Sequence, residues 1–411
     1  MTLSQRSFIC VGTYEKGMIG LELTRNPTTT PQTEDDTLLY LSAPFSPQPH
    51  LGSVDTIAIC GSILATGCTD ELIRLYDLGR MKEIGKCNEH SASLSAIALI
   101  ERGQDKAMVS CDKSGVLYFW TSKKNGQEWN CQKGLELGHS YINELSVHPS
   151  AKMAIGLSSI DHCYHLINLQ RGNIAQKVVI KRKDPLRHCL WADDGFTYIV
   201  TCGKHFLLFN LHQQSDTGKE QPLIEGDLSF DVISLLFLDA RTFVCGGEKG
   251  VWGIVCVKDG EGETPPSFSY HPLKTLSDRV KGISRILLPT DIPEMPDFTF
   301  SIAVGCSDGS VSVWLLAVDE DSVDGILVAF ANIMTRLTCL CATHIDPVME
   351  DDEIEEAPEP LPRKEKRQQS SKDEEKTAER SQANDESSKS TKNGEKKKRK
   401  RQPKLSVSKH E

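Results

Sequence analysis

Residues 302–314 read Ile302-Ala-Val-Gly-Cys-Ser-Asp-Gly-Ser-Val-Ser-Val-Trp314, and this stretch decides the fold. Apolar residues alternate with small or polar ones on both sides of the pair Asp308-Gly309. Such alternation around an Asp-Gly pair is a strong short-range signal for a β-hairpin. Because an isolated hairpin is marginally stable in water, a fold built on this one requires further copies elsewhere in the chain.

Five other segments repeat the pattern, at residues 63–77, 106–120, 154–169, 197–211 and 243–257. The closing positions 76, 120, 167, 209, 255 and 314 are separated by 44, 47, 42, 46 and 59 residues. Four of these five intervals lie near the ~40–45-residue period of a four-stranded blade in a WD-repeat propeller. The insertions 260–269 and 289–296 lengthen the last interval. A seventh hairpin at residues 8–23 completes the set, so the sequence predicts an all-β, seven-bladed WD40 β-propeller.

A shorter alternating run precedes each of the last six hairpins and is typical of an innermost blade strand. These runs lie at 54–59, 94–99, 142–147, 186–191, 232–237 and 280–286. The first hairpin has no such run, whereas the run 336–341 has no hairpin after it. We therefore expect the C-terminal strand to pair with the N-terminal hairpin, which closes the ring and removes free sheet edges.

Charge divides the chain into a propeller at residues 1–347 and a tail at residues 348–411. The first part carries 30 basic and 41 acidic side chains, which argues against a broad nucleic-acid footprint on the propeller. The tail has too few large apolar residues to offset its ordering entropy, so we expect an acidic-then-basic disordered segment. It ends in a cluster typical of nuclear localisation signals, namely Lys396, Lys397, Lys398, Arg399, Lys400 and Arg401.

Some side chains of the hairpins are expected to brace blades. In WD repeats a His, a turn Asp, a Ser or Thr and a Trp can form one buried network, which stabilises the blade when every member is satisfied. Asp70 and Asp308 lack a Gly-His partner, whereas His139 pairs with Asp161. In the copy at 106–120, Ser114 takes the turn position because Asp112 lies two residues early. The predicted blade markers are His90, His139, Asp70, Asp161, Asp308, Trp120 and Trp314.

Motifs for catalysis, cofactors and metals are absent from the sequence. There is no GxGxxG, GxxxxGK[ST], HExxH, EF-hand loop or CxxC pair, and neither His90 nor His139 accompanies a nucleophile motif. Asp193-Asp194-Gly195 fits a solvated turn better than a metal site. Residues 177–183 (KVVIKRK) fit a solvated strand and turn, with contact to RNA or an acidic partner as the alternative. We therefore expect a non-enzyme with no catalytic residue, no cofactor and no metal.

The composition also bears on the compartment. No window holds 18 consecutive apolar residues, which predicts no membrane span. The 14 cysteines are scattered and are expected to be reduced, buried thiols.

The order of several segments resembles the p21-activated protein kinase-interacting protein 1-like family of WD-repeat proteins. At the C-terminal end the resemblance lies in Arg279-Val-Lys281, in Ser307-Asp-Gly309 through Trp314 and in Thr335-Arg-Leu-Thr-Cys-Leu340. Earlier it lies in Val11-Gly-Thr-Tyr14, Leu64-Ala-Thr-Gly67 and His148-Pro-Ser150, and it covers roughly residues 8–343. The resemblance implies a nucleolar protein needed for assembly of the large ribosomal subunit. In some members it also implies binding and restraint of a p21-activated kinase.

Three functions follow as hypotheses. The first is a propeller scaffold of the nucleus and nucleolus, monomeric within a larger complex. It binds pre-60S assembly factors and ribosomal proteins, with rRNA as a further candidate partner. The second is a signalling adaptor that binds a p21-activated protein kinase and restrains it. The third is a substrate receptor of a ubiquitin ligase, for which Tyr76-Asp-Leu-Gly-Arg80 places its Arg one residue later than the Trp-Asp-x-Arg motif requires.

Overall fold

The structure is a computed structural model that describes most of the chain before residue 346. The described residues are 5–25, 37, 39–103, 105–123, 126, 128–138, 140–212, 221–260, 265–289, 298–319 and 322–345. Contacts divide the chain into the units Met1–Asp351 and Asp352–Glu411, and all described residues belong to the first. The predicted tail and its localisation signal, Lys396 to Arg401, lie outside the described residues, so both remain predictions.

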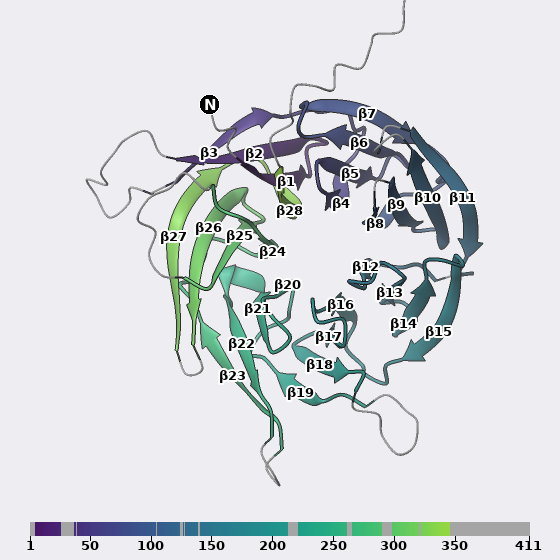
Figure 1. Ribbon diagram of the computed structural model, residues 1–411. Helices are drawn as coiled ribbons and strands as arrows, with labels where there is room; N and C mark the ends of the chain where they lie inside the picture. Colours follow the sequence, from purple (N-terminus) through teal and green to yellow (C-terminus); the bar gives the residue numbers. More distant parts are fainter. Residues whose placement is uncertain are drawn as a thin grey trace, which may run out of the picture. The chain divides into compact units, whose positions relative to one another are not determined.

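Seven four-stranded antiparallel sheets are arranged as blades around a central axis (Figure 1), which confirms the predicted propeller. Blade 1 contains β28 (Leu337–Ile345), β1 (Arg6–Thr13), β2 (Met18–Arg25) and β3 (Leu39–Phe45), in order from the centre outward. Blade 2 contains β4 (Val54–Cys60), β5 (Ile63–Cys68), β6 (Ile73–Asp77) and β7 (Lys82–Cys87). Blade 3 contains β8 (Leu94–Arg102), β9 (Asp105–Asp112), β10 (Val116–Lys123) and β11 (Glu128–Glu136).

The remaining four blades follow the same order. Blade 4 contains β12 (Glu144–Val147), β13 (Met153–Ser158), β14 (Cys163–Asn168) and β15 (Asn173–Val179). Blade 5 contains β16 (Leu186–Trp191), β17 (Thr197–Cys202), β18 (His205–Asn210) and β19 (Ile224–Asp227). Blade 6 contains β20 (Ser234–Phe237), β21 (Thr242–Gly246), the 3₁₀ turn η1 (Glu248–Gly250), β22 (Trp252–Lys258) and β23 (Ser267–Pro272). Blade 7 contains β24 (Val280–Arg285), β25 (Phe300–Cys306), β26 (Ser310–Val318) and β27 (Val323–Asn332).

Blade 1 is assembled from both ends of the described chain. β28 pairs antiparallel with β1, with Cys341 opposite Cys10 and Ile345 opposite Arg6. The predicted ring closure is therefore confirmed. Without β28, the inner edge of β1 would expose a row of unpaired backbone groups.

The core is divided among the interfaces between neighbouring blades. Along β1, Ile9 and Val11 join the apolar cluster shared with blade 7, whereas Phe8 and Cys10 join the cluster shared with blade 2. Successive side chains of a strand point to opposite faces, and here both faces are covered by another blade. This two-sided burial explains why the middle strands contain so many apolar residues and why one blade cannot fold alone.

Register also locates the closing position of each hairpin, including the degenerate ones. Val255 of β22 lies opposite Phe243, just as Trp314 of β26 lies opposite Ile302. The insertion 260–269 covers the loop after β22 and the first residues of β23, and the insertion 289–296 falls between β24 and β25. Among the described residues, no helix is long and apolar enough to cross a membrane.

Candidate functional site

A complete buried polar network braces blade 3. The indole N–H of Trp120 donates to Ser110 Oγ (2.8 Å), and Ser110 Oγ lies 2.7 Å from His90 Nε2. His90 Nδ1 lies 2.8 Å from Asp112 Oδ2. Burial lowers the pKa of His90 despite the neighbouring carboxylate, which favours a neutral ring that donates from Nδ1 to Asp112 and accepts the Ser110 hydroxyl at Nε2. Every polar atom in this chain of contacts therefore has a partner.

Asp112 is the acidic member of that network, although sequence spacing assigned the turn position to Ser114. The second carboxylate oxygen of Asp112 accepts hydrogen bonds from the backbone N–H groups of Ser114 (3.0 Å) and Val116 (3.2 Å). The Asp112 carboxylate thus lies before the turn and accepts hydrogen bonds from backbone N–H groups within and after it. A side chain two residues early can fill the same place in space, so the sequence interpretation of Ser114 as the substitute is incomplete.

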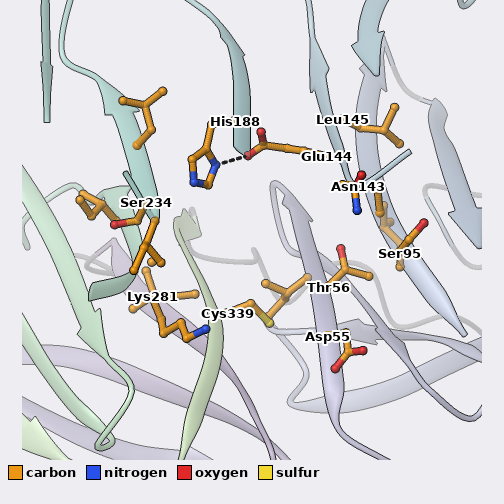
Figure 2. Close-up of a pocket in the computed structure, with 18 residues that line it drawn as sticks. Asp55, Thr56, Ser95, Asn143, Glu144, Leu145, His188, Ser234, Lys281 and Cys339 are labelled. Atoms are coloured by element: carbon orange, nitrogen blue, oxygen red, sulfur yellow. Dashed lines mark hydrogen bonds and ion pairs between the residues drawn. The ribbon is translucent and has the colours of Figure 1, made fainter. Parts of the chain in front are cut away.

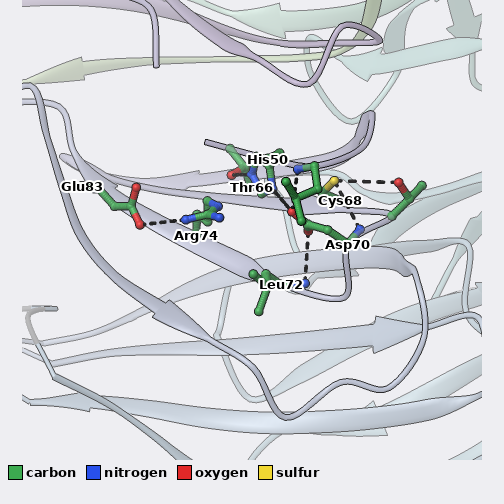
Figure 3. Close-up of polar contacts among 9 residues, drawn as sticks. His50, Thr66, Cys68, Asp70, Leu72, Arg74 and Glu83 are labelled. Carbon is green, nitrogen blue, oxygen red and sulfur yellow. Dashed lines mark hydrogen bonds and ion pairs between the residues drawn. The ribbon is translucent and has the colours of Figure 1, made fainter. Parts of the chain in front are cut away.

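Blade 2 holds a second network, in which Asp70 has a histidine partner although the sequence offers it no Gly-His pair. His50 Nδ1 lies 3.2 Å from Asp70 Oδ2, and His50 Nε2 lies 2.8 Å from Thr66 Oγ1 (Figure 3). His50 was missed because it follows Pro49 instead of Gly. The signal that could have found it is position: His50 precedes Val54 by four residues, as His90 precedes Leu94.

The same corner of blade 2 offers three potential metal ligands. One ligand atom from each of His50, Cys68 and Asp70 lies within 4.8 Å of the others. Both nitrogens of His50 already contact Asp70 and Thr66, however, and burial raises the pKa of the Cys68 thiol, which disfavours the thiolate that binds metals. We interpret this cluster as a blade brace.

Blade 7 carries the third network, which is more open. Asp308 accepts hydrogen bonds from the backbone N–H (3.0 Å) and hydroxyl (2.7 Å) of Ser310, whose Oγ lies 2.9 Å from Ser277 Oγ. The Trp314 indole N–H donates to Ser312 (2.9 Å) instead of to this group. No described histidine forms a hydrogen bond with Asp308. This aspartate fixes its own turn and is joined to the preceding loop through Ser277 and Ser310.

Replacing Asp308 with alanine is expected to lower the free energy of unfolding by about 1 kcal/mol, because two local hydrogen bonds at an exposed carboxylate are lost. Chemical denaturation of the variant beside the unchanged chain measures this effect. We expect partner binding to persist. Unchanged stability together with lost binding would assign Asp308 to a binding surface instead.

The network of blade 4 contains no hydrogen bond from a described histidine to Asp161, although Ser140 contacts both Asp161 and the buried Ser158, whose Oγ lies 2.6 Å from Ser140 Oγ. Asp161 accepts a hydrogen bond from Lys177 Nζ (2.6 Å) at the surface. His139, its predicted partner, lies outside the described residues. Exposed ion pairs contribute little to stability, so the contact seen at Asp161 is a minor one.

The segment Asp193-Asp194-Gly195 forms a turn, and the basic stretch 177–183 forms ion pairs at the surface. Asp194 accepts the backbone N–H groups of Phe196 and Thr197, both at 2.9 Å, and Gly195 has φ +69°. Asp194 therefore fixes a turn. In the basic stretch 177–183, Lys177 pairs with Asp161 and Arg182 with Glu225, which supports the solvated interpretation.

The inner strands surround a central channel that holds a cavity of about 330 Å³ (Figure 2). Residues from the inner strand of each blade, or from the loop before it, line this cavity. Its polar and charged members are Asp55, Thr56, Ser95, Asn143, Glu144, His188, Ser234, Lys281 and Cys339. Sequence analysis singled out none of these as a site, because they converge from seven separate segments.

One pair in the channel links blades 4 and 5. Glu144 Oε1 lies 3.0 Å from His188 Nδ1, and the Glu144 Oε2 atom accepts the backbone N–H of Cys189 at 2.6 Å. Burial alone would lower the pKa of His188, but the charge and hydrogen bond of Glu144 outweigh burial and raise it. The pair therefore favours the imidazolium form of His188 and ties two blades together.

We expect the stability contributed by this pair to depend on pH. Because the pKa of His188 is raised by folding, the contribution is fully present below the unfolded-state value of about 6.5 and is lost as pH rises through the folded-state pKa. Denaturation between about pH 6 and 9 should show this decline. Glu144→Gln keeps an acceptor for Cys189 but should flatten the decline, and an unaltered slope in that variant would exclude the pair as its source.

The chain is similar in sequence to proteins of two vertebrates. No protein-family model matches the chain. It is 25% identical over 335 residues to "p21-activated protein kinase-interacting protein 1-like" of Xenopus laevis, covering 81% of each chain. The protein of the same name from Danio rerio is 25% identical over 299 residues, covering 72% of each chain.

A solved structure titled "Structure of U3-55K" matches with a TM-score of 0.53 at 12% identity, covering 71% of this chain and 85% of that one. At that identity the likeness shows the propeller fold alone. The sequence relatives confirm the resemblance inferred from the order of segments. The chain is a seven-bladed β-propeller whose sequence is similar to the p21-activated protein kinase-interacting protein 1-like proteins over most of its length.

Proposed function

We propose that the chain is a non-catalytic scaffold in the nucleolar assembly of the large ribosomal subunit. Its partners in this role are pre-60S assembly factors and ribosomal proteins, with direct contact to rRNA as a further part of the proposal. The observation that carries the proposal is the family resemblance, supported by the similarity to the Xenopus relative over 81% of the chain. That family resemblance implies a role in large-subunit assembly.

The geometry supports the scaffold part of the proposal. The two histidine–aspartate pairs in blades 2 and 3 are buried and joined to Thr66 and Ser110, an arrangement that stabilises blades. A general base needs access to a substrate proton, whereas His50 and His90 are 3% and 5% exposed. Partner binding by the faces of the ring is therefore favoured over catalysis by these groups.

Depletion of the protein tests the role in ribosome assembly. We expect precursors of the large-subunit rRNA to accumulate, and a tagged chain to concentrate in nucleoli and co-purify with pre-60S factors. A chain in which residues 396–401 are changed to glutamine should lose nuclear entry yet bind the same factors in nuclear extract. Normal rRNA processing after depletion, with the tagged chain outside nucleoli, would contradict the proposal.

Docking on a p21-activated protein kinase is the second candidate, favoured by the names of the relatives. A direct pull-down with the regulatory region of such a kinase tests it. Binding of purified components with reduced kinase activity would support an adaptor role. The ubiquitin-ligase alternative gains no support from blade 2, where Arg80 turns back toward Asp77, with its Nε atom 3.8 Å from Asp77 Oδ2.

A further inference from the structure

One arc of the central channel gathers positive charge. Arg187 and Lys281 are each the second residue of an inner strand, β16 and β24, while Arg279 directly precedes β24 and Arg336 directly precedes β28. These strands belong to blades 5, 7 and 1, so the four cations cluster at the end of the channel where the inner strands begin. The four cations are spread over 150 residues of sequence, so only the closed ring brings them together.

Lys281 is the central member of this cluster. It lines the channel cavity (Figure 2) and is half-buried, yet it makes no hydrogen bond or ion pair with any residue that the structure describes. Burial lowers the pKa of Lys281, and the positive charges of Arg279, Arg336 and Arg187 lower it further. A half-buried ammonium among like charges is electrostatically costly, and an anion beside it would relieve that cost.

The carboxylates that line the channel are already engaged elsewhere. Glu144 contacts His188 at 3.0 Å, and Asp55 lies 3.6 Å from the ammonium of Lys113. Glu248, at the adjacent loop, pairs with Arg279 at 2.7 Å. The chain therefore brings four cations together without supplying Lys281 with an anion from the described part of the channel.

We propose that this end of the channel binds an acidic segment of a partner protein, with one carboxylate entering the cavity beside Lys281 and Arg187. The cavity of about 330 Å³ is large enough for such a side chain. The proposal goes beyond the scaffold role, because it holds whether the partner belongs to ribosome assembly or to kinase signalling.

An acidic peptide fits this site better than a nucleic acid. Proteins that hold single-stranded nucleic acid combine a long basic groove with aromatic side chains on which bases stack. The cavity lining contains no Phe, Tyr or Trp.

The test uses fluorescence anisotropy with labelled hexaglutamate, hexaglutamine and hexauridine as probes. The protein is the full-length chain with residues 396–401 changed to glutamine, so that the basic tail does not capture the acidic probe. We expect hexaglutamate to bind more tightly than either other probe, and its affinity to fall as salt is added.

Lys281→Gln should weaken hexaglutamate binding about tenfold, and Arg187→Gln should weaken it by a smaller factor. Lys152→Gln, which removes an exposed lysine before β13, serves as the matched control and should leave the affinity unchanged. Equal thermal midpoints for the three variants would show that each remains folded. The proposal is overturned if Lys281→Gln binds hexaglutamate as tightly as the control, or if hexauridine is the preferred probe and depends on Lys281.

Discussion

Replacement of His90 with alanine should lower the free energy of unfolding by about 3 kcal/mol, the largest single-residue effect expected in the described polar networks. The imidazole connects Asp112 to Ser110, and all three side chains are buried. Its removal leaves a buried carboxylate and hydroxyl without their partner, and breaking a buried pair in this way costs more than the pair itself contributes. Urea denaturation at neutral pH measures the change.

His344→Ala is a matched control, because this histidine is exposed near the end of β28. It should change the free energy of unfolding by less than about 0.5 kcal/mol. The decrease in the free energy of unfolding caused by His90→Ala should also be smaller in an Asp112→Asn background, because no buried charge is then left without a partner. Equal losses in both backgrounds would show that His90 acts through packing alone.

Removal of β28 should abolish cooperative folding. A chain ending at residue 333 loses Leu337 and Ile345 from the core, together with every backbone hydrogen bond between β28 and β1. Burial of each such apolar side chain contributes about 1.5–3 kcal/mol, so the combined loss approaches the whole stability of an ordinary domain, about 5–15 kcal/mol. The exposed edge of β1 should also promote aggregation.

A chain ending at residue 347 keeps β28 and serves as the control. Its thermal unfolding should match that of the full chain, which would also test the predicted boundary between propeller and tail. Calorimetry and size-exclusion chromatography of the two truncated chains distinguish the outcomes. A soluble, cooperatively unfolding chain that ends at residue 333 would mean that the ring does not depend on closure by β28.

The polar networks show where sequence reasoning stopped short. The sequence pattern marks His90, whereas His50 lies outside the pattern because the expected Gly-His pair is absent. Asp112 lies two residues early in the repeat pattern, yet its carboxylate occupies the place of the turn aspartate. Side chains can reach the same point from different backbone positions, so spacing along the chain is an incomplete guide to these contacts.

The order of hairpins and inner strands was sufficient to predict the architecture. Alternation of period two encodes each hairpin locally, and the unmatched run at 336–341 left one economical way to close the ring, which the pairing of β28 with β1 confirms. The channel could not be predicted in this way. Glu144 and His188 come from different blades, as do Arg187 and Lys281, and only closure of the ring brings each set together. Local backbone pattern therefore determines the blades, whereas the electrostatics of the channel arise from contacts between segments far apart in sequence.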